Sequence, residues 1–445
     1  MKDMSQSNSD LPTRLLLNLA PWRNAKTWRI AFSGGLDSTV LLHLLATLAK
    51  TESLPPLSAI HVHHGLQAVA DAWPAHCRDL CAALSVPLQV EYVQVAPGAS
   101  LERAARDARY AAFAARLGAG ELLLSAQHRD DQAETLLFRL LRGAGVQGLA
   151  GMPVSRALGA GYLLRPLLDC SRTELLDYAQ ALGLVWVDDP SNADERFSRN
   201  YLRRQVLPRL SQRWPQAHNA LARSAAHLSE AQHLLDELAQ QDLHAANVPT
   251  DFAWLPMPCL SLPALRELSE ARQRNALRYW LRPLTTMPDT EHWAGWQALR
   301  DAAPDASPVW QLASGELRRS HDHLWWLAGD WLRSPPSPDI VVEANQHLPL
   351  TGNGVVHIQG SLPVGDWQLG YRRVGEQIML PGRGHRDLKR LFNERRVPAF
   401  VRDRLPLLRL DNQVVAIANL PGLQGDADGS WQLHWQPLSD DQGLS

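Results

Sequence analysis

The chain has 445 residues, more than one hydrophobic core usually supports, so we expect two or three domains. Its 44 Lys and Arg against 46 Asp and Glu give a net charge of −2, which is ordinary for an enzyme and excludes an overall basic protein. Four cysteines are too few for a disulfide framework. The sequence contains no run of about 18 apolar residues that could cross a membrane, and its polar first ten residues carry no secretion signal. We therefore expect a cytoplasmic protein.

A six-residue turn, Ser33-Gly34-Gly35-Leu36-Asp37-Ser38, follows an apolar run at 28–32 and precedes a helical run at 39–45. A strand, a glycine turn and a helix N-terminus in this order surround an anion with unpaired N–H groups and partial positive charge. The glycines let backbone amides approach a phosphate, and the two serines add hydroxyl donors. Asp37 could hold Mg²⁺ or a cationic group beside the phosphates. The alternative is an ordinary strand-to-helix turn that a serine caps.

Strands and helices alternate in the first half. We predict further strands at 57–63, 88–95 and 121–126, and helices at 72–84, 101–117 and 130–141. Strands separated by helices of this length indicate an α/β fold with a doubly wound, mostly parallel sheet. Ligands of such sheets lie beyond the carboxyl ends of the strands. The glycine turn, His63-His64-Gly65 and Gln127-His128 each follow a strand, so we expect them to form one site.

A second motif begins the helix predicted at 130–141. Asp131 and Glu134 are three residues apart and therefore share one face of that helix. Two carboxylates near a phosphate turn could bind Mg²⁺ or serve as a general base. The alternative is an acidic first turn that complements the helix dipole. The cluster His61-Val62-His63-His64 lacks a third spaced ligand, so we expect polar lining at the end of a strand rather than a metal site.

The pattern changes after residue 215. Amphipathic helices are predicted at 221–238 and 262–281, and short β-like runs at 355–358 and 414–417. Ser334-Pro335-Pro336-Ser337-Pro338 is typical of a linker. We therefore predict three domains, at 1–215 (α/β), 216–333 (mainly helical) and 334–445 (linker and a small α+β domain).

One segment near the C-terminus is strongly basic. Between Tyr371 and Leu410 eleven Lys and Arg stand against four acidic residues. The cations are Arg372, Arg373, Arg383, Arg386, Lys389, Arg390, Arg395, Arg396, Arg402, Arg404 and Arg409. Charge segregated in this way is typical of phosphate binding, so we expect an RNA-contacting surface, with a solvated helix face as the alternative.

Five blocks in order resemble the tRNA(Ile)-lysidine synthetase family of PP-loop ATP pyrophosphatases. They are SGGLDS at 33–38, HVHHGL at 61–66, ERAARDARY at 102–110, HRDDQAETLLFRLLRGAG at 128–145 and DDPSNADERFSRNYLRR at 188–204. The segment at 388–408 also resembles the C-terminal domain of the longer members. The resemblance implies a Rossmann-like PP-loop domain and an enzyme that adenylates the wobble cytidine of isoleucine tRNA with a CAU anticodon, converting ATP to AMP and pyrophosphate. Free L-lysine then displaces AMP through its ε-amine, which forms lysidine.

The resemblance also assigns roles to residues. ATP would be bound by Ser33, Gly34, Gly35, Leu36, Asp37 and Ser38. The catalytic residues would be Asp37, Arg109, Asp131, Glu134 and Arg199. Of these, Arg109, Asp131 and Glu134 would handle lysine and activation, and Arg199 would contact AMP or the tRNA. Asp37 and Asp131 would hold Mg²⁺, and the oligomeric state is left open, with a homodimer as one expectation.

Other readings of the same turn are possible. A tRNA thiolase would share SGGLDS, but thiolation needs a reactive or cluster-binding cysteine set, and none of the four cysteines has that spacing. An amidotransferase would need a glutaminase domain, for which the N-terminal segment is too short. An RNA-binding protein with a decayed nucleotide fold is disfavoured because Asp37, Asp131 and Glu134 are all present.

Overall fold

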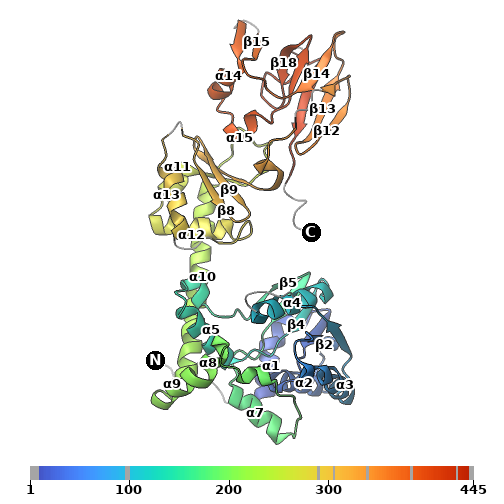
Figure 1. Cartoon of the computed structure of the whole chain (residues 1–445), viewed down its shortest axis with the longest axis vertical. Helices are drawn as coiled ribbons and strands as arrows, with labels where there is room; N and C mark the ends of the chain where they lie inside the picture. Colours follow the sequence, from blue (N-terminus) through green and yellow to red (C-terminus); the bar gives the residue numbers. More distant parts are fainter. Residues whose placement is uncertain are drawn as a thin grey trace. The chain divides into compact units, whose positions relative to one another are not determined.

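The computed structural model describes residues 10–95, 101–287, 291–303, 306–336, 340–380, 384–426 and 429–439. Ser337 and Pro338 of the predicted linker and Arg383 of the basic segment lie outside these ranges. The chain divides into two compact units, Met1–His233 and Leu234–Ser445 (Figure 1). The division falls inside helix α10 (Ala217–Ala246), so the three-domain division stays a prediction. No helix in the described ranges is long and apolar enough to cross a membrane.

The first unit is built on a six-stranded sheet with the order β3-β2-β1-β4-β6-β5. Its strands are β1 (Thr27–Ala31), β2 (Leu57–His63), β3 (Leu88–Tyr92), β4 (Glu121–Leu124), β5 (Ser155–Leu158) and β6 (Gly161–Leu164). All pairs are parallel except the hairpin β5-β6. The predicted doubly wound, mostly parallel sheet is therefore confirmed. The strand order reverses between β1 and β4, which is where such sheets bind ligands.

Helices connect the strands of this sheet. They are α1 (Leu11–Leu19), α2 (Leu36–Leu48), α3 (Trp73–Ala83), α4 (Leu101–Arg116), α5 (Arg129–Leu140), α6 (Val146–Leu149), α7 (Arg172–Ala181), α8 (Ser198–Tyr201) and α9 (Leu207–Arg213). Helix α2 is apolar around most of its surface because it contacts β1, β2 and α7. A π-helical turn, Leu202–Val206, joins α8 to α9.

The second unit begins with helices and a small sheet. Its helices after α10 are α11 (Leu262–Arg266), α12 (Glu270–Leu281) and α13 (Ala294–Asp301). The sheet has the order β7-β10-β9-β8, from β7 (Cys259–Ser261), β8 (Val309–Leu312), β9 (Gly315–Ser320) and β10 (His323–Leu327). The helix predicted at 262–281 is divided in two, because the Ser269 hydroxyl accepts from the Arg272 backbone N–H and starts a new helix. The small sheet was not predicted.

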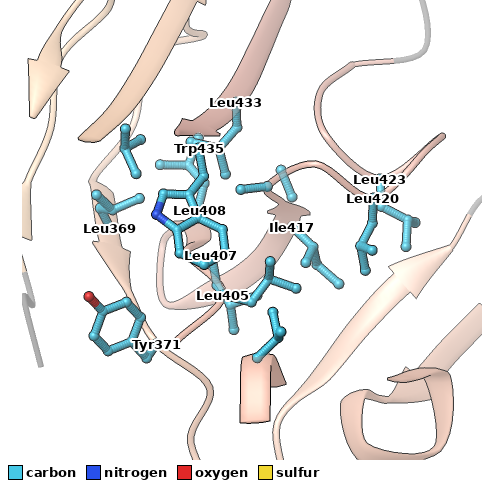
Figure 2. Close-up of a cluster of buried hydrophobic side chains, with 14 of the residues drawn as sticks. Leu369, Tyr371, Leu405, Leu407, Leu408, Ile417, Leu420, Leu423, Leu433 and Trp435 are labelled. Carbon is cyan, nitrogen blue, oxygen red and sulfur yellow. The ribbon is translucent and has the colours of Figure 1, made fainter. Parts of the chain in front are cut away.

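The rest of the second unit packs two sheets face to face. One has the order β11-β14-β17-β18-β15-β16 and the other β12-β13-β19. The strands are β11 (Ile340–Val341), β12 (His347–Leu350), β13 (Gly354–Gly360), β14 (Trp367–Gly370), β15 (Gln377–Leu380), β16 (Gly384–Asp387), β17 (Leu407–Leu410), β18 (Gln413–Ile417) and β19 (Trp431–Gln436), with helices α14 (Leu388–Glu394) and α15 (Ala399–Arg402). Figure 2 shows Leu408 of β17 meeting Leu433 and Trp435 of β19 in the shared core.

The same core extends into the small sheet that precedes it. Trp325 of β10 packs against Phe400 with ring centres 5.9 Å apart, and Trp331 packs against Trp435 at 6.2 Å. The Arg404 guanidinium lies 4.8 Å from the centre of the Trp331 ring. Arg404 also donates hydrogen bonds to the carbonyl oxygens of residues 330, 333 and 352. Residues on both sides of the predicted linker therefore share one hydrophobic core.

Candidate active site

A cavity of about 480 Å³ opens at the carboxyl ends of β1, β2 and β4. The glycine turn, the strand end at His64 and the segment at Gln127 all line it, so the structure brings these three predicted regions together. Of the residues assigned by resemblance, those that line the cavity are Ser33, Gly35, Leu36, Asp37, Ser38, Arg109 and Asp131. Gly34, Glu134 and Arg199 are not among its lining residues.

The glycine turn is held by its own serines. The Ser38 hydroxyl accepts from the Ser33 backbone N–H at 3.2 Å and lies 3.0 Å from the Ser33 hydroxyl. Gly34 has a φ of +84°, and a Cβ there would lie 3.1 Å from Cys77 Sγ. Glycine is therefore required at this position for two reasons, its backbone conformation and the closeness of α3. The turn delivers Gly35 as the N-cap of α2, whose first turn carries Asp37.

His128 lies buried between three carboxylates. Its Nε2 is 3.6 Å from Asp37 Oδ2 and 3.5 Å from Asp131 Oδ2, and its Nδ1 is 3.7 Å from Asp130 Oδ2. Burial by itself lowers the pKa of His128, but the nearby carboxylates of Asp130, Asp37 and Asp131 raise this pKa to about 10. His128 therefore joins the two predicted metal ligands as a cation. The sequence predicts His128 at the site but indicates no role for it.

Asp37 keeps one oxygen without a partner. Its Oδ1 is buried and accepts no hydrogen bond from any described residue, although Asp37 lines the cavity. A buried carboxylate oxygen in this position fits a hard cation such as Mg²⁺, which takes oxygen ligands from one or two carboxylates and from substrate phosphates. The donor set around the turn therefore fits the ion that the resemblance implies.

Arg203 binds both carboxylates of the second motif. Its Nε donates to Glu134 Oε1 at 2.5 Å and its Nη2 to Glu134 Oε2 at 2.9 Å, and Nη2 also donates to Asp131 Oδ1 at 3.1 Å. Burial raises the pKa of Glu134, while hydrogen bonds with Glu134 outweigh the burial of Arg203 and raise the pKa of the guanidinium. Arg203 is a site residue that the sequence does not predict. Its place in the block at 188–204 was the one available signal.

The other two arginines assigned by resemblance lie in different places. Arg109 of α4 lines the cavity, and its Nε donates to His64 Nε2 at 3.1 Å. Arg199 of α8 lies over the Phe138 ring, with its Cζ 6.0 Å from the ring centre. The structure therefore groups Arg109 with the glycine turn and places Arg199 beside α5, on the side where α8 meets it.

A second cavity of about 290 Å³ adjoins the first. The two share lining residues from β2, α3, α4 and the segment after α7, namely His61, Val62, His64, Trp73, Arg109, Asp189, Ser191 and Asn192. The second cavity contains none of the residues of the glycine turn. His61 and His64 therefore lie where the two cavities meet. The polar lining predicted at the end of β2 is therefore confirmed.

The described cations of the basic segment differ in burial, and Arg372, Arg386 and Arg402 are half-buried. Arg409 is fully buried and makes two hydrogen bonds with Glu376, at 2.7 and 3.0 Å, and Arg404 is buried over Trp331. The exposed members are Arg373, Lys389, Arg390, Arg395 and Arg396. The surface charge is therefore smaller than the residue count indicated, because buried arginines bind groups inside the protein.

Family comparisons match the chain in three places. A PP-loop domain matches residues 8–210, a TilS substrate binding domain matches 260–325 and a TilS substrate C-terminal domain matches 367–435. Among curated proteins, the chain is 63% identical over 441 residues to a tRNA(Ile)-lysidine synthase of Pseudomonas fluorescens, covering 99% of this chain and all of the relative. It is 59% identical to that of Pseudomonas aeruginosa over 98% of this chain and 99% of the relative. A third relative, from Coxiella burnetii, is 38% identical over 96% of this chain and 97% of its own length.

Proposed function

Because the chain belongs to the tRNA(Ile)-lysidine synthase family, we infer that the cavity at the glycine turn is where ATP adenylates the cytidine and lysine then displaces AMP. The enzyme ligates lysine to the wobble cytidine of isoleucine tRNA through an adenylated cytidine, and ATP becomes AMP and pyrophosphate. The thiolase alternative is not supported, because the relatives that match the full length of the chain are tRNA(Ile)-lysidine synthases.

The glycine turn is proposed to hold the phosphates of ATP. Its serines and the first turn of α2 supply hydroxyl and backbone donors at a helix N-terminus. Asp37 would hold Mg²⁺, which when bound would neutralise charge on the pyrophosphate that leaves. The unpartnered oxygen of Asp37 supports this assignment most directly. Arg109 of α4, which also lines the cavity, would add positive charge.

The lysine step requires a neutral ε-amine, because an ammonium has no lone pair for attack. Asp131 lines the cavity and is proposed to receive the ammonium of free L-lysine and to accept its proton. Glu134 is proposed to position Asp131 rather than to bind lysine. Both of its carboxylate oxygens accept hydrogen bonds from Arg203, and Arg203 also donates to Asp131. Arg199, outside the lining of the cavity, is proposed to contact the tRNA rather than AMP.

Three parts of this assignment stay predictions. We propose that the exposed cations of the basic segment bind tRNA phosphates, as charge of one sign gathered on a surface is suited to do. We propose free L-lysine as the second substrate, because ligation of lysine is the activity of the family. A homodimer stays an expectation.

The experiment that tests the site combines ATP, labelled lysine and isoleucine tRNA, with label in RNA as the readout. We expect Asp37→Ala to abolish labelling at saturating ATP and Mg²⁺, because the turn loses its unpartnered carboxylate. The matched control is Asp177→Ala, which removes an exposed carboxylate of α7. Normal labelling by the Asp37 variant would reject the assignment of the site, while no labelling by the unaltered protein would reject the activity.

A further inference from the structure

His61 offers an unused hydrogen-bond acceptor where the two cavities meet. The side chain is 2% exposed, and its Nδ1 lies 2.9 Å from the carbonyl oxygen of Phe32. Because a carbonyl only accepts, Nδ1 must carry the hydrogen of the ring, and Nε2 is left with a lone pair. This Nε2 is buried and has no partner among the described residues. Burial lowers the pKa of His61, so the ring stays neutral at neutral pH.

His64 offers the complementary unused donor. Arg109 Nε donates to His64 Nε2 at 3.1 Å, so this nitrogen is the acceptor and Nδ1 carries the hydrogen. The Nδ1 is buried and has no partner among the described residues. Burial, followed by the charge of Arg109, lowers the pKa of His64 to about 4, so this ring is neutral too. Two neutral rings that line the same cavities therefore leave one acceptor and one donor unpaired.

Unpaired buried polar groups cost free energy, and such a pair is kept where a ligand completes it. An amino group beside a ring nitrogen is the matching chemistry, which adenine and cytosine both present. Of the two bases, adenine is favoured by position. The carbonyl that orients His61 belongs to Phe32, the residue directly before Ser33 of the glycine turn. A nucleotide whose phosphates lie on that turn therefore has its base within reach of β2.

We propose that His61 and His64 read the adenine of ATP. The adenine 6-amino group donates to His61 Nε2, and His64 Nδ1–H donates to a neighbouring ring nitrogen of the base. A 6-oxo purine would place an oxygen lone pair against the lone pair of Nε2. The pair therefore selects ATP over inosine or guanosine triphosphate. This inference rests on the proposed function of the cavity as the ATP site.

The test measures nucleotide binding by calorimetry with Mg²⁺ and without tRNA. The probes are ATP, purine riboside triphosphate (which lacks the 6-amino group) and inosine triphosphate. We expect the unaltered protein to bind ATP roughly tenfold more tightly than purine riboside triphosphate, since one buried hydrogen bond is lost. Inosine triphosphate should be bound more weakly still, by roughly a hundredfold against ATP. Equal binding of ATP and purine riboside triphosphate would overturn the proposal without any variant.

Two substitutions separate the roles of the two ring nitrogens. His61→Asn keeps a donor near the Nδ1 position for the Phe32 carbonyl but removes the acceptor, so it should bind ATP and purine riboside triphosphate equally. His61→Gln places an acceptor near the Nε2 position and should restore part of the preference for ATP. The matched control is His43→Asn. The His43 ring is hydrogen-bonded to the Tyr178 hydroxyl at 3.0 Å and lines neither cavity, so this variant should keep the preference for ATP over purine riboside triphosphate.

The outcomes also separate the adenine of ATP from the cytosine of the tRNA. If His61→Asn keeps the preference for ATP and instead raises KM for tRNA, the pair reads the wobble cytosine and the adenine proposal is wrong. Thermal unfolding of each variant shows whether it is folded. Lysine incorporation by the unaltered protein reports on the proposed function separately, so its failure is not confused with a failure of base reading.

Discussion

Arg203 holds Glu134 through two parallel hydrogen bonds, from Nε at 2.5 Å and from Nη2 at 2.9 Å. Glu134 is 3% exposed, so its carboxylate is filled by the guanidinium and closed to water. Any ammonium that binds Glu134 would have to displace a bidentate arginine, which is among the stronger pairs in proteins. Asp131 Oδ1 accepts from the same guanidinium and its Oδ2 from the His128 backbone N–H at 3.1 Å, and Asp131 lines the cavity together with Asp37, Asp188 and Asp189.

We expect Arg203→Ala to destabilise the first unit, because it leaves the Glu134 charge buried without a partner. The cost should be about 2–4 kcal/mol, below the fully buried limit because the Arg203 side chain is 37% exposed. Adding Glu134→Gln should recover part of this loss. Differential scanning calorimetry of the single and double variants measures the coupling. The control Arg196→Ala, from an exposed pair with Asp194, should melt like the unaltered protein, and additive effects of the two buried changes would contradict the pairing.

The basic segment should show two separate phenotypes. Arg395→Ala with Arg396→Ala removes exposed cations and should weaken tRNA binding, lowering the salt slope by roughly one unit or less per lost phosphate contact. Arg409→Ala should instead lower the melting temperature, because Glu376 loses its buried partner. Filter binding across a KCl series and thermal unfolding measure the two effects. An unchanged salt slope in the exposed double variant would mean that these arginines do not touch RNA.

Three of the four cysteines should be unreactive toward alkylating reagents in the folded protein. Burial raises the pKa of the Cys77 and Cys170 thiols to about 12 and that of Cys81 to about 11. Alkylation needs the thiolate, so iodoacetamide at pH 8 should leave these three unmodified in the native protein and leave lysine incorporation intact. Mass spectrometry counts the alkylated sites, and the unfolded chain in guanidinium should take up four. Rapid loss of activity with labelling of Cys77 would point instead to a reactive thiol at the site.

His64 should make the protein sensitive to acid. A histidine in an unfolded chain titrates near 6.5, whereas burial and then Arg109 lower the pKa of folded His64 to about 4. The folded state therefore binds this proton less readily, and the stability gained from neutral His64 is full above pH 6.5 and lost as the pH falls toward 4. His64→Gln should decline less steeply in urea unfolding between pH 7 and 4.5. His227→Gln, at an exposed position of α10, should keep the original slope.

Local patterns predicted strands β1 to β4 and helices α2 to α5 of the first unit, but not the hairpin β5-β6, helix α1 or helices α6 to α9. Strand β2 was expected at 57–63 and lies at Leu57–His63, because an apolar run between turns carries its own signal. The small sheet of the second unit was not predicted. In β9 Leu317 is followed by Arg318 and Arg319, which hides the strand period, and its stability comes from pairing with β8 and β10 rather than from propensity.

The sequence predicted which residues line the site better than it predicted the contacts that these residues make. The glycine turn and Asp131 line one cavity, since strand ends of a parallel sheet meet at one edge. The block at 188–204 contains Arg203 but does not show its contacts, because the π-helical turn that carries Arg203 is a hydrogen-bond irregularity with no hydrophobic pattern. Arg404 and Arg409 were counted with the surface charges, because a sequence does not distinguish a buried arginine from an exposed one.

The core shared by β10 and the last strand has a consequence for synthesis. Trp325 and Trp331 leave the ribosome well before Phe400 and Trp435, the rings that cover them. Protein domains fold as they emerge, so these two indoles stay in contact with water until the end of the chain is made. A chain that stops after residue 333 keeps them uncovered, and its tryptophan fluorescence should be shifted to longer wavelength. During synthesis, residues after 333 therefore bury apolar side chains of the nascent chain that were made before them.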